Sequence, residues 1–216
     1  MGFSGFGEQV VDFYEGLAAD NSKVYWDGHK SVYAADVRAP MVALLEELES
    51  EFGKGAVFRP HRDVRFAKDK SPYKTHCGAV IEQGRGGGAY YVQVSAEGLT
   101  IGGGSYAMAS DQLARYRTAV DGDTAGPALE KILETLSGQG WEILGDRLKT
   151  RPRGVDPGHP RLELLRHRSI YTMRSWDPDD VLHEPETLDR VRAGWRQLRG
   201  FNEWCADHIG VSDQGW

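Results

Sequence analysis

The spacing of apolar residues changes twice along this chain, and this change restricts the fold more than any other feature of the sequence. Up to about residue 52, apolar residues recur at helical intervals, as in the series Phe6, Val10, Phe13, Tyr14 and Leu17. Residues 56–105 instead hold short runs rich in β-branched and aromatic residues, separated by turn residues. Helical spacing then returns, with further strand-like runs, up to about residue 210. The pattern predicts an α+β fold in which an antiparallel central sheet is flanked by N-terminal and C-terminal helices.

We expect a single domain over residues 1–216, because this length suits one domain and no linker is evident. Its N-terminal helices lie at about 4–52, the sheet with a basic motif at about 56–105, and the helices with a second strand set at about 108–210. The expected strands are Val64–Phe66, His76–Ile81, Ala89–Ser95, Leu99–Ile101, Trp141–Leu148 and Ser169–Trp176.

Turn and capping residues divide these elements. Asp20-Asn21-Ser22 should end the first helix and cap the second, and Pro40 suits the first turn of a third helix. The run Gly84–Gly88 predicts a hairpin loop between two strands. Gly102–Gly104 follows a strand and precedes a helix, so it predicts a flexible connection or an anion cradle built from backbone amides such as that of Gly103.

Composition limits the class of protein. The chain has a net charge of −6, and its mean hydropathy is −0.51, which is typical of a globular chain. We find neither an apolar run long enough for a membrane span nor a secretory signal at the N-terminus. Two separated cysteines, Cys77 and Cys205, favour a cytoplasmic location with free thiols. The acidic balance argues against a general nucleic-acid coat protein.

One short segment has the opposite charge to the whole chain. Residues 59–76 hold six cations and two carboxylates, a net charge of +4 in a chain of −6; these are Arg59, Arg62, Arg65, Lys68, Lys70 and Lys74 with Asp63 and Asp69. Side chains of a strand alternate between its two faces. If Val64 and Phe66 lie in a strand and face the protein core, Arg62 lies on that apolar face as well. We therefore expect either a bulge near Arg62 or an ion pair from Arg62 to Asp63 or Asp69.

Two interpretations of this segment remain open. In the first, it binds a small anion that bears a phosphate or carboxylate: Arg62, Arg65 and Lys70 hold the charge, Asp63 orients the arginines, and Tyr73 or His76 contacts the rest of the ligand. In the second, the same arginines and carboxylates form a structural ion-pair network in a non-catalytic scaffold or protein-interaction domain. His76 as a general base is the weaker alternative to a structural histidine.

Other sites have little support. No metal motif and no cofactor motif is present, and the sequence leaves open whether the protein is an enzyme. Single-stranded nucleic-acid binding through Arg59, Arg65, Lys68, Tyr73 and Tyr91 is a minor possibility. Leu188, Val191, Trp195, Leu198, Asn202 and Cys205 recur at near-heptad spacing, which predicts either docking onto the domain's own sheet or, less favoured, a homodimer seam.

The basic segment also resembles the signature of a bacterial and fungal family known as domain of unknown function 2461. That signature reads Arg-x-x-Arg-Asp-x-Arg-Phe followed by Asp-Lys-x-x-Tyr, and it corresponds here to Arg59, Arg62, Asp63, Arg65, Phe66, Asp69, Lys70 and Tyr73. Weaker similarities extend over most of the chain, although Trp26-Asp27 stands where the family usually has Trp-Phe. The resemblance implies an α+β fold and no particular reaction.

Overall fold

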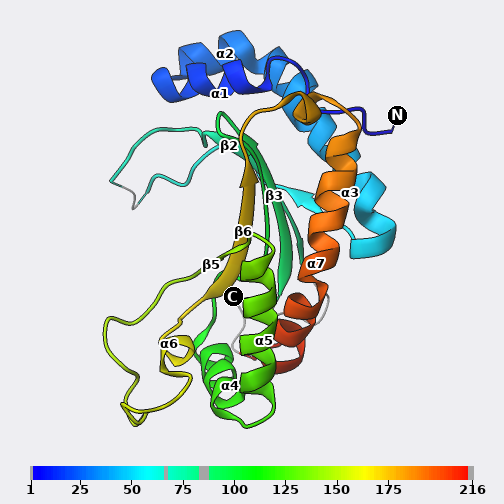
Figure 1. Cartoon of the computed structure of the whole chain (residues 1–216). Coiled ribbons are helices and arrows are strands. Elements are labelled where there is room, and N and C mark those ends of the chain that lie inside the picture. Colours follow the sequence, from blue (N-terminus) through cyan, green and yellow to red (C-terminus); the bar gives the residue numbers. More distant parts are fainter. Residues whose placement is uncertain (1, 66–67, 83–87, 214–216) are drawn as a thin grey trace. The chain divides into compact units, whose positions relative to one another are not determined.

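The computed structural model describes residues 2–65, 68–82 and 88–213 (Figure 1). Within these residues, six strands form one sheet in the order β1-β2-β3-β4-β6-β5, and the antiparallel α+β architecture predicted from the sequence is confirmed. The strands are β1 (Ala56–Val57), β2 (His76–Glu82), β3 (Ala89–Ser95), β4 (Gly98–Ser105), β5 (Glu142–Leu144) and β6 (Ile170–Trp176). The predicted hairpin loop at Gly84–Gly88 lies outside the described residues except for Gly88.

The chain divides into two compact units that share several elements. The first unit is Met1–Ile81, Tyr91–Ile101 and Ser175–Gly194, and the second is Glu82–Tyr90, Gly102–Arg174 and Trp195–Trp216. The helices before β1 are α1 (Val10–Ala19), α2 (Lys23–Val32), the π-helix η1 (Tyr33–Arg38) and α3 (Ala39–Phe52); those after β4 are α4 (Ser110–Asp121), α5 (Ala125–Gly138), α6 (Leu162–Leu165), the 3-10 helix η2 (Asp180–His183) and α7 (Glu186–His208). The prediction of a single domain over 1–216 remains a prediction.

Local sequence signals start and interrupt the first helices. The Ser22 hydroxyl accepts a hydrogen bond from the Tyr25 amide at 3.1 Å, so Ser22 caps α2 as predicted. Pro40 stands at the start of α3 and has no N–H to donate to the carbonyl of Asp36, four residues earlier. The Gly7 amide donates to that carbonyl at 2.9 Å instead. The π-helix, which ends at Arg38, therefore connects the N-terminal segment to α3.

The core of the first unit lies between these helices and one face of β2. Cys77, Ala79 and Ile81 alternate along β2 and are buried, as the predicted strand phase requires. Cys77 lies near two buried helical residues, Tyr14 and Tyr33. Ile81 lies beside Gly55, where it meets the buried Leu45 of α3. Burial raises the pKa of the Cys77 thiol to about 11, so this free cysteine is a core residue and not an activated nucleophile.

The second unit is built around the C-terminal half of α7. Trp195, Leu198, Asn202 and Cys205 are buried, with the ring of Trp195 at 5.3 Å from that of Tyr90 and the Asn202 amide 3.2 Å from the carbonyl oxygen of Ala89. These contacts with β3 account for the apolar spacing of this part of the helix. The homodimer through α7 remains a prediction.

The glycine run Gly102–Gly104 was expected to form a connection before a helix, and this prediction is wrong because all three residues lie inside β4. A Cβ atom on Gly103 would come within 3.0 Å of the Ala89 carbonyl oxygen and of a Leu198 methyl group. The glycines therefore allow α7 to approach the sheet closely, which a residue with a side chain would prevent.

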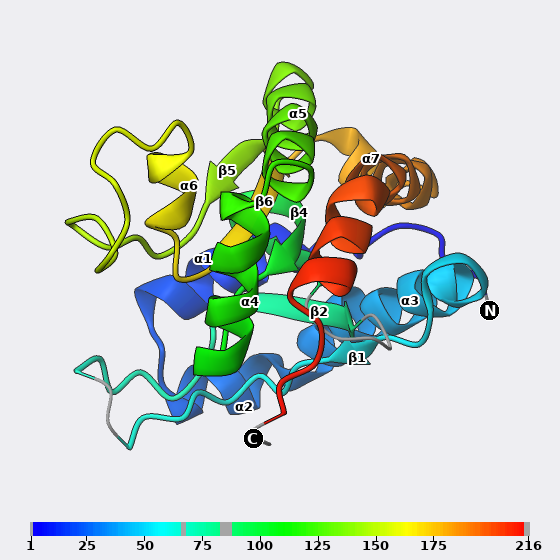
Figure 2. The ribbon, with the colours of Figure 1, turned by 90° about the horizontal axis from the view of Figure 1, so that it is seen from below.

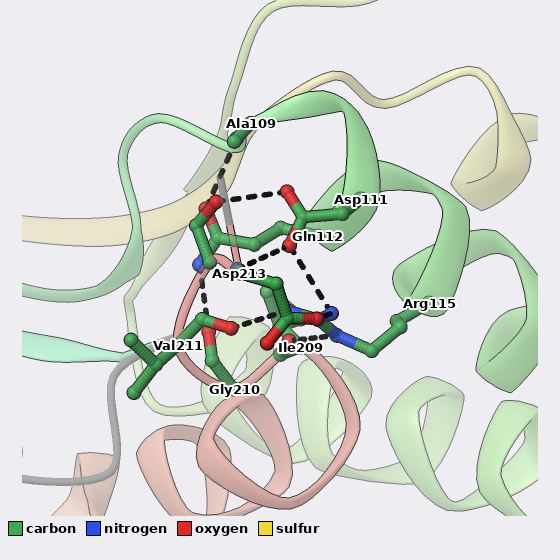
Figure 3. A network of polar contacts seen from close by, with 9 residues as sticks. Ala109, Asp111, Gln112, Arg115, Ile209, Gly210, Val211 and Asp213 are labelled. Carbon is green, nitrogen blue, oxygen red and sulfur yellow. Dashed lines mark hydrogen bonds and ion pairs between the residues drawn. The ribbon is translucent and has the colours of Figure 1, made fainter. Parts of the chain in front are cut away.

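A polar network fixes the chain end of the second unit to α4 (Figure 3). The Arg115 guanidinium donates to the carbonyl oxygens of Ile209 (2.7 Å) and Val211, and it pairs with Asp111 and Asp213 at 3.2 Å each. The backbone amide of Asp213 and the hydroxyl of Ser212 both donate to the Asp111 carboxylate. The pKa of Asp111 falls to about 2, chiefly because of the Asp213 amide. Residues 209–213 are thus held by specific contacts.

Candidate functional site

The basic segment belongs to the first unit and connects β1 to β2. Its two ends pair with each other: His61 and Tyr73 form an isolated antiparallel bridge, with Arg62 donating to Pro72 (2.9 Å) and Lys74 to Pro60 (2.8 Å) through their backbones. Figure 2 shows the segment running beside α2. The segment is therefore a long loop closed at its base.

Residues 62–65 form no strand, so the prediction of a strand at Val64–Phe66 is wrong for the described residues; Phe66 itself lies outside them. Aspartate side chains bind backbone amides two residues ahead: Asp63 accepts from the Arg65 amide at 3.2 Å, and Asp69 from the Ser71 amide at 2.9 Å. Such turns compete with strand pairing for the backbone donors. The apolar alternation of Val64 and Phe66 was outweighed by these local bonds.

The loop's charges pair largely with one another. Arg65 binds both oxygens of Asp63, with Nη2 at 2.6 Å from Oδ2, and Arg62 pairs with Asp69, one of the two partners expected for it. The Ser71 hydroxyl and amide, followed by Arg62, lower the pKa of Asp69 to about 2. Lys70 donates to the Val64 carbonyl at 2.9 Å. Five of the predicted site residues (Arg62, Asp63, Arg65, Asp69 and Lys70) are therefore already engaged within the loop.

Tyr73 is buried and holds the base of the loop on the helices. Its ring stacks on Trp26 with centroids 4.4 Å apart, and its backbone is bound in both directions by the Asn21 side chain, at 3.0 and 3.1 Å. The ring of Trp26 also contacts those of Phe13 and Tyr33. With only 5% of its surface exposed, Tyr73 holds the base of the loop in place, and its predicted contact with a ligand stays a prediction. Asn21 and Trp26 were not among the predicted site residues.

An open depression of about 390 Å³ lies where the loop meets β2, lined by Arg62, Asp63, Lys74, Thr75 and His76. Three of these side chains can be cationic, and the single carboxylate among them binds Arg65. Among the residues that the structure describes, no carboxylate forms an ion pair with Lys74 or His76. The depression therefore holds two basic side chains that form no ion pair with the described residues, Lys74 and His76, beside Arg62, which pairs with Asp69.

The pKa values of Lys74 and His76 are both lowered by burial and by neighbouring positive charges. Burial, and after it the charge of Arg59, lowers the pKa of Lys74. Burial and then the charge of Lys74 lower the pKa of His76, while Glu97 opposes the shift. Both shifts mean that the cationic forms are disfavoured without a partner, and a bound anion would favour them.

The predicted site residues thus divide into three sets. The first set lines the depression and consists of Arg62, Asp63 and His76. The second set lies in the adjoining loop and consists of Arg65, Asp69 and Lys70, together with Arg59, which is exposed near the start of the loop. The third is Tyr73, which packs under the base of the loop. Gly103 belongs to the second unit, within β4. Lys74 was counted among the cations but missed as a site residue, although its shared strand phase with His76 was a usable signal.

Comparison with known families agrees with this structure. A family model described as a conserved hypothetical protein (DUF2461) matches residues 9–204. The chain belongs to this family. The match includes the whole basic loop, β2 and the helices that support them, so the depression lies within the DUF2461 region. No curated protein shows a significant match to the chain.

The described part of this DUF2461 protein contains neither a cluster of metal-ligating side chains nor a helix suited to a membrane. In residues 2–65, 68–82 and 88–213, no group of three histidine, cysteine, aspartate or glutamate side chains could hold a metal ion. Over the same residues, no helix combines the length and the apolar character needed to cross a membrane.

Replacing Arg65 with glutamine should change the melting temperature by less than about 2 °C, because exposed ion pairs contribute little to stability. The side chains of Arg65 and Asp63 are 77% and 45% exposed. Differential scanning calorimetry of R65Q beside the wild type checks this, with D63N as the matched variant of the partner. A fall near 10 °C in either variant would show instead that the pair locks the fold.

Proposed function

We propose that this protein binds a small anion, bearing a phosphate or carboxylate, in the depression between the basic loop and β2. The observation that carries the proposal is the pair Lys74 and His76, which line the depression and form no ion pair with a carboxylate among the described residues; of these carboxylates, only the more distant Glu97 acts on His76 through its charge. Arg62, which pairs with Asp69, lines the depression as well. An anion placed here would gain charge-assisted hydrogen bonds without first breaking an ion pair of Lys74 or His76.

The loop supplies rigidity to this site. Asp63 and Asp69 bind backbone amides and arginines of the loop on either side, in residues 62–65 and 69–71, and Asn21 and Trp26 hold Tyr73 next to Lys74. A site whose donors are already held in place loses less entropy on binding. This division of roles, with some charges ordering the loop and others left for the ligand, supports the anion-binding interpretation.

The alternative function, a scaffold with a structural ion-pair network, is favoured by one observation: Arg62–Asp69 and Arg65–Asp63 do form pairs. Both pairs are exposed, and exposed pairs stabilise a fold only slightly. We therefore keep the scaffold as the second candidate.

Isothermal titration calorimetry with inorganic phosphate, sulfate and malonate tests the proposal. We expect binding of at least one anion by the wild type, and a loss of at least about tenfold in affinity for K74M and for H76Q, as for the removal of a charged hydrogen-bond donor. K54M is the matched control, because Lys54 is exposed between α3 and β1 and does not line the depression. Absence of binding at millimolar anion, or equal losses in K54M and K74M, would refute the proposal.

The affinity for sulfate should rise as the pH falls. The folded chain holds the pKa of His76 below the ordinary value of about 6.5, so the imidazole is neutral at pH 7. Sulfate stays a dianion over this range and favours the imidazolium, so its affinity should increase between about pH 7 and 5, by up to about tenfold per pH unit. Without ligand, the stability of the fold should instead decrease as the pH falls. Neutral His76 favours the folded state, and this contribution is lost as the pH falls through the pKa of His76 in the folded chain.

Titrations at several pH values check this dependence. In H76Q the affinity for sulfate should become nearly independent of pH between 7 and 5. An unchanged slope in H76Q would assign the titration to another group.

A further inference from the structure

A partly exposed aromatic ring stands next to the depression. Among the described residues four large apolar side chains are exposed, namely Val24, Phe58, Tyr106 and Val211. Phe58 follows β1, and its amide donates to the Gly78 carbonyl of β2 at 2.9 Å, so its backbone is held by the sheet. A phenylalanine left at the surface on a fixed backbone is available for stacking.

The Phe58 ring packs against β2 at Gly78, so a flat ligand would stack on the part of the ring that stays exposed. Gly78 has no side chain, and a Cβ there would meet the Tyr91 hydroxyl at 2.7 Å and Cδ2 of Phe58 at 3.3 Å. The rings of Phe58 and Tyr91 are 6.4 Å apart, and the Tyr91 hydroxyl bonds to the Gln93 side chain at 2.7 Å. Gln93 is two residues along β3 and so lies on the same face. Two aromatic rings and a polar amide thus lie together on this face of β2 and β3.

Lys74 connects the aromatic surface to the anion site. Its ammonium lies 4.8 Å from the centroid of the Phe58 ring, and the same side chain lines the depression. Without an anion the ammonium rests on the ring through a cation–π contact. An anion in the depression would attract the ammonium and uncover that face of Phe58.

We propose that the ligand's anionic group is a phosphate ester joined to a planar heterocycle, as in a nucleoside monophosphate. The phosphate binds Lys74, His76 and Arg62, the heterocycle stacks on Phe58, and the polar pair Tyr91–Gln93 lies within reach of its edge. This inference rests on the proposed anion binding and adds the chemical class of the ligand. A heterocycle fits better than a plain hydrocarbon ring because Gln93, whose amide oxygen accepts from the Tyr91 hydroxyl, also carries amide N–H donors beside the stacking surface.

Calorimetric titration of the full chain with inorganic phosphate, ribose 5-phosphate and adenosine monophosphate tests this inference. The wild type should bind adenosine monophosphate at least about fivefold more tightly than ribose 5-phosphate, as expected for one stacked base. Phe58→Leu keeps an apolar side chain but removes the ring, so it should abolish this preference without weakening the binding of inorganic phosphate. Tyr106→Leu, at an exposed aromatic residue of the second unit, should keep the preference.

The two proposals fail in different ways. If inorganic phosphate binds in a manner that depends on Lys74, but ribose 5-phosphate binds as tightly as adenosine monophosphate, the inference is overturned and anion binding stands. Equal losses for all three ligands in Phe58→Leu would also overturn it, because they would indicate a structural role for the ring. If none of the three ligands binds the wild type, both proposals are overturned. Binding of a single-stranded oligonucleotide without binding of the mononucleotide would replace the small ligand by a nucleic acid.

Discussion

Replacing Trp26 with alanine is expected to lower the stability of the protein by about 3–5 kcal/mol, the cost typical of deleting a buried tryptophan. The residue is 5% exposed, and its ring lies 4.4 Å from that of Tyr73 and 4.8 Å from that of Tyr33. In a domain of this size the melting temperature should fall on the order of 10 °C, which calorimetry measures directly.

The same substitution should weaken anion binding well below the new melting temperature. Trp26 supports Tyr73, which directly precedes Lys74, so the loss of the stacked ring frees the base of the loop. Trp26→Phe keeps a ring at this position and should lie between the wild type and the alanine variant in both measurements. Full anion affinity in a folded Trp26→Ala protein would show that the loop holds Lys74 without this support.

Gly104→Ala is expected to destabilise the protein by about 2–6 kcal/mol. The backbone of Gly104 has a φ of 112°, where an L-residue is strained, and a Cβ would come within 2.6 Å of the Phe201 ring and 2.7 Å of the Ile170 carbonyl oxygen. The strain and the overpacking add together, because neither the β6 backbone nor a ring of α7 can move away freely. Chemical denaturation of the variant beside the wild type measures the loss.

Gly138→Ala is the matched control for this substitution. Gly138 ends α5, nothing lies within 4 Å of a Cβ placed there, and its φ is not positive. Alanine should be neutral or stabilising by about 0.5–1 kcal/mol, because it favours the helix and restricts the unfolded chain. A Gly104→Ala protein as stable as Gly138→Ala would mean that β4 and α7 do not pack as closely as the structure indicates.

Much of the fold could be predicted because its signals are local. The Ser22 cap, the position of Pro40, the strand Ala89–Ser95 and the burial of alternate residues along β2 all follow from neighbours within a few residues. The two errors arose where a local signal had a competing cause. At Val64 a strand was predicted, but the turns at Asp63 and Asp69 take up the backbone donors of the loop. The glycines of β4 were interpreted as a flexible connection, although they make room for α7.

Most of the helices and strands, and a positive segment in an acidic chain, could be predicted from residue patterns, because periodicity and charge belong to the residues themselves. Which of those charges are already paired depends on the folded structure. Arg62 and Arg65 bind the loop's own carboxylates, whereas Lys74 and His76 face an open depression. The base of the loop is held by Asn21, which lies 52 positions before Tyr73. Contacts over such separations depend on the packing of α2 beside the loop, and no pattern within the segment encodes them.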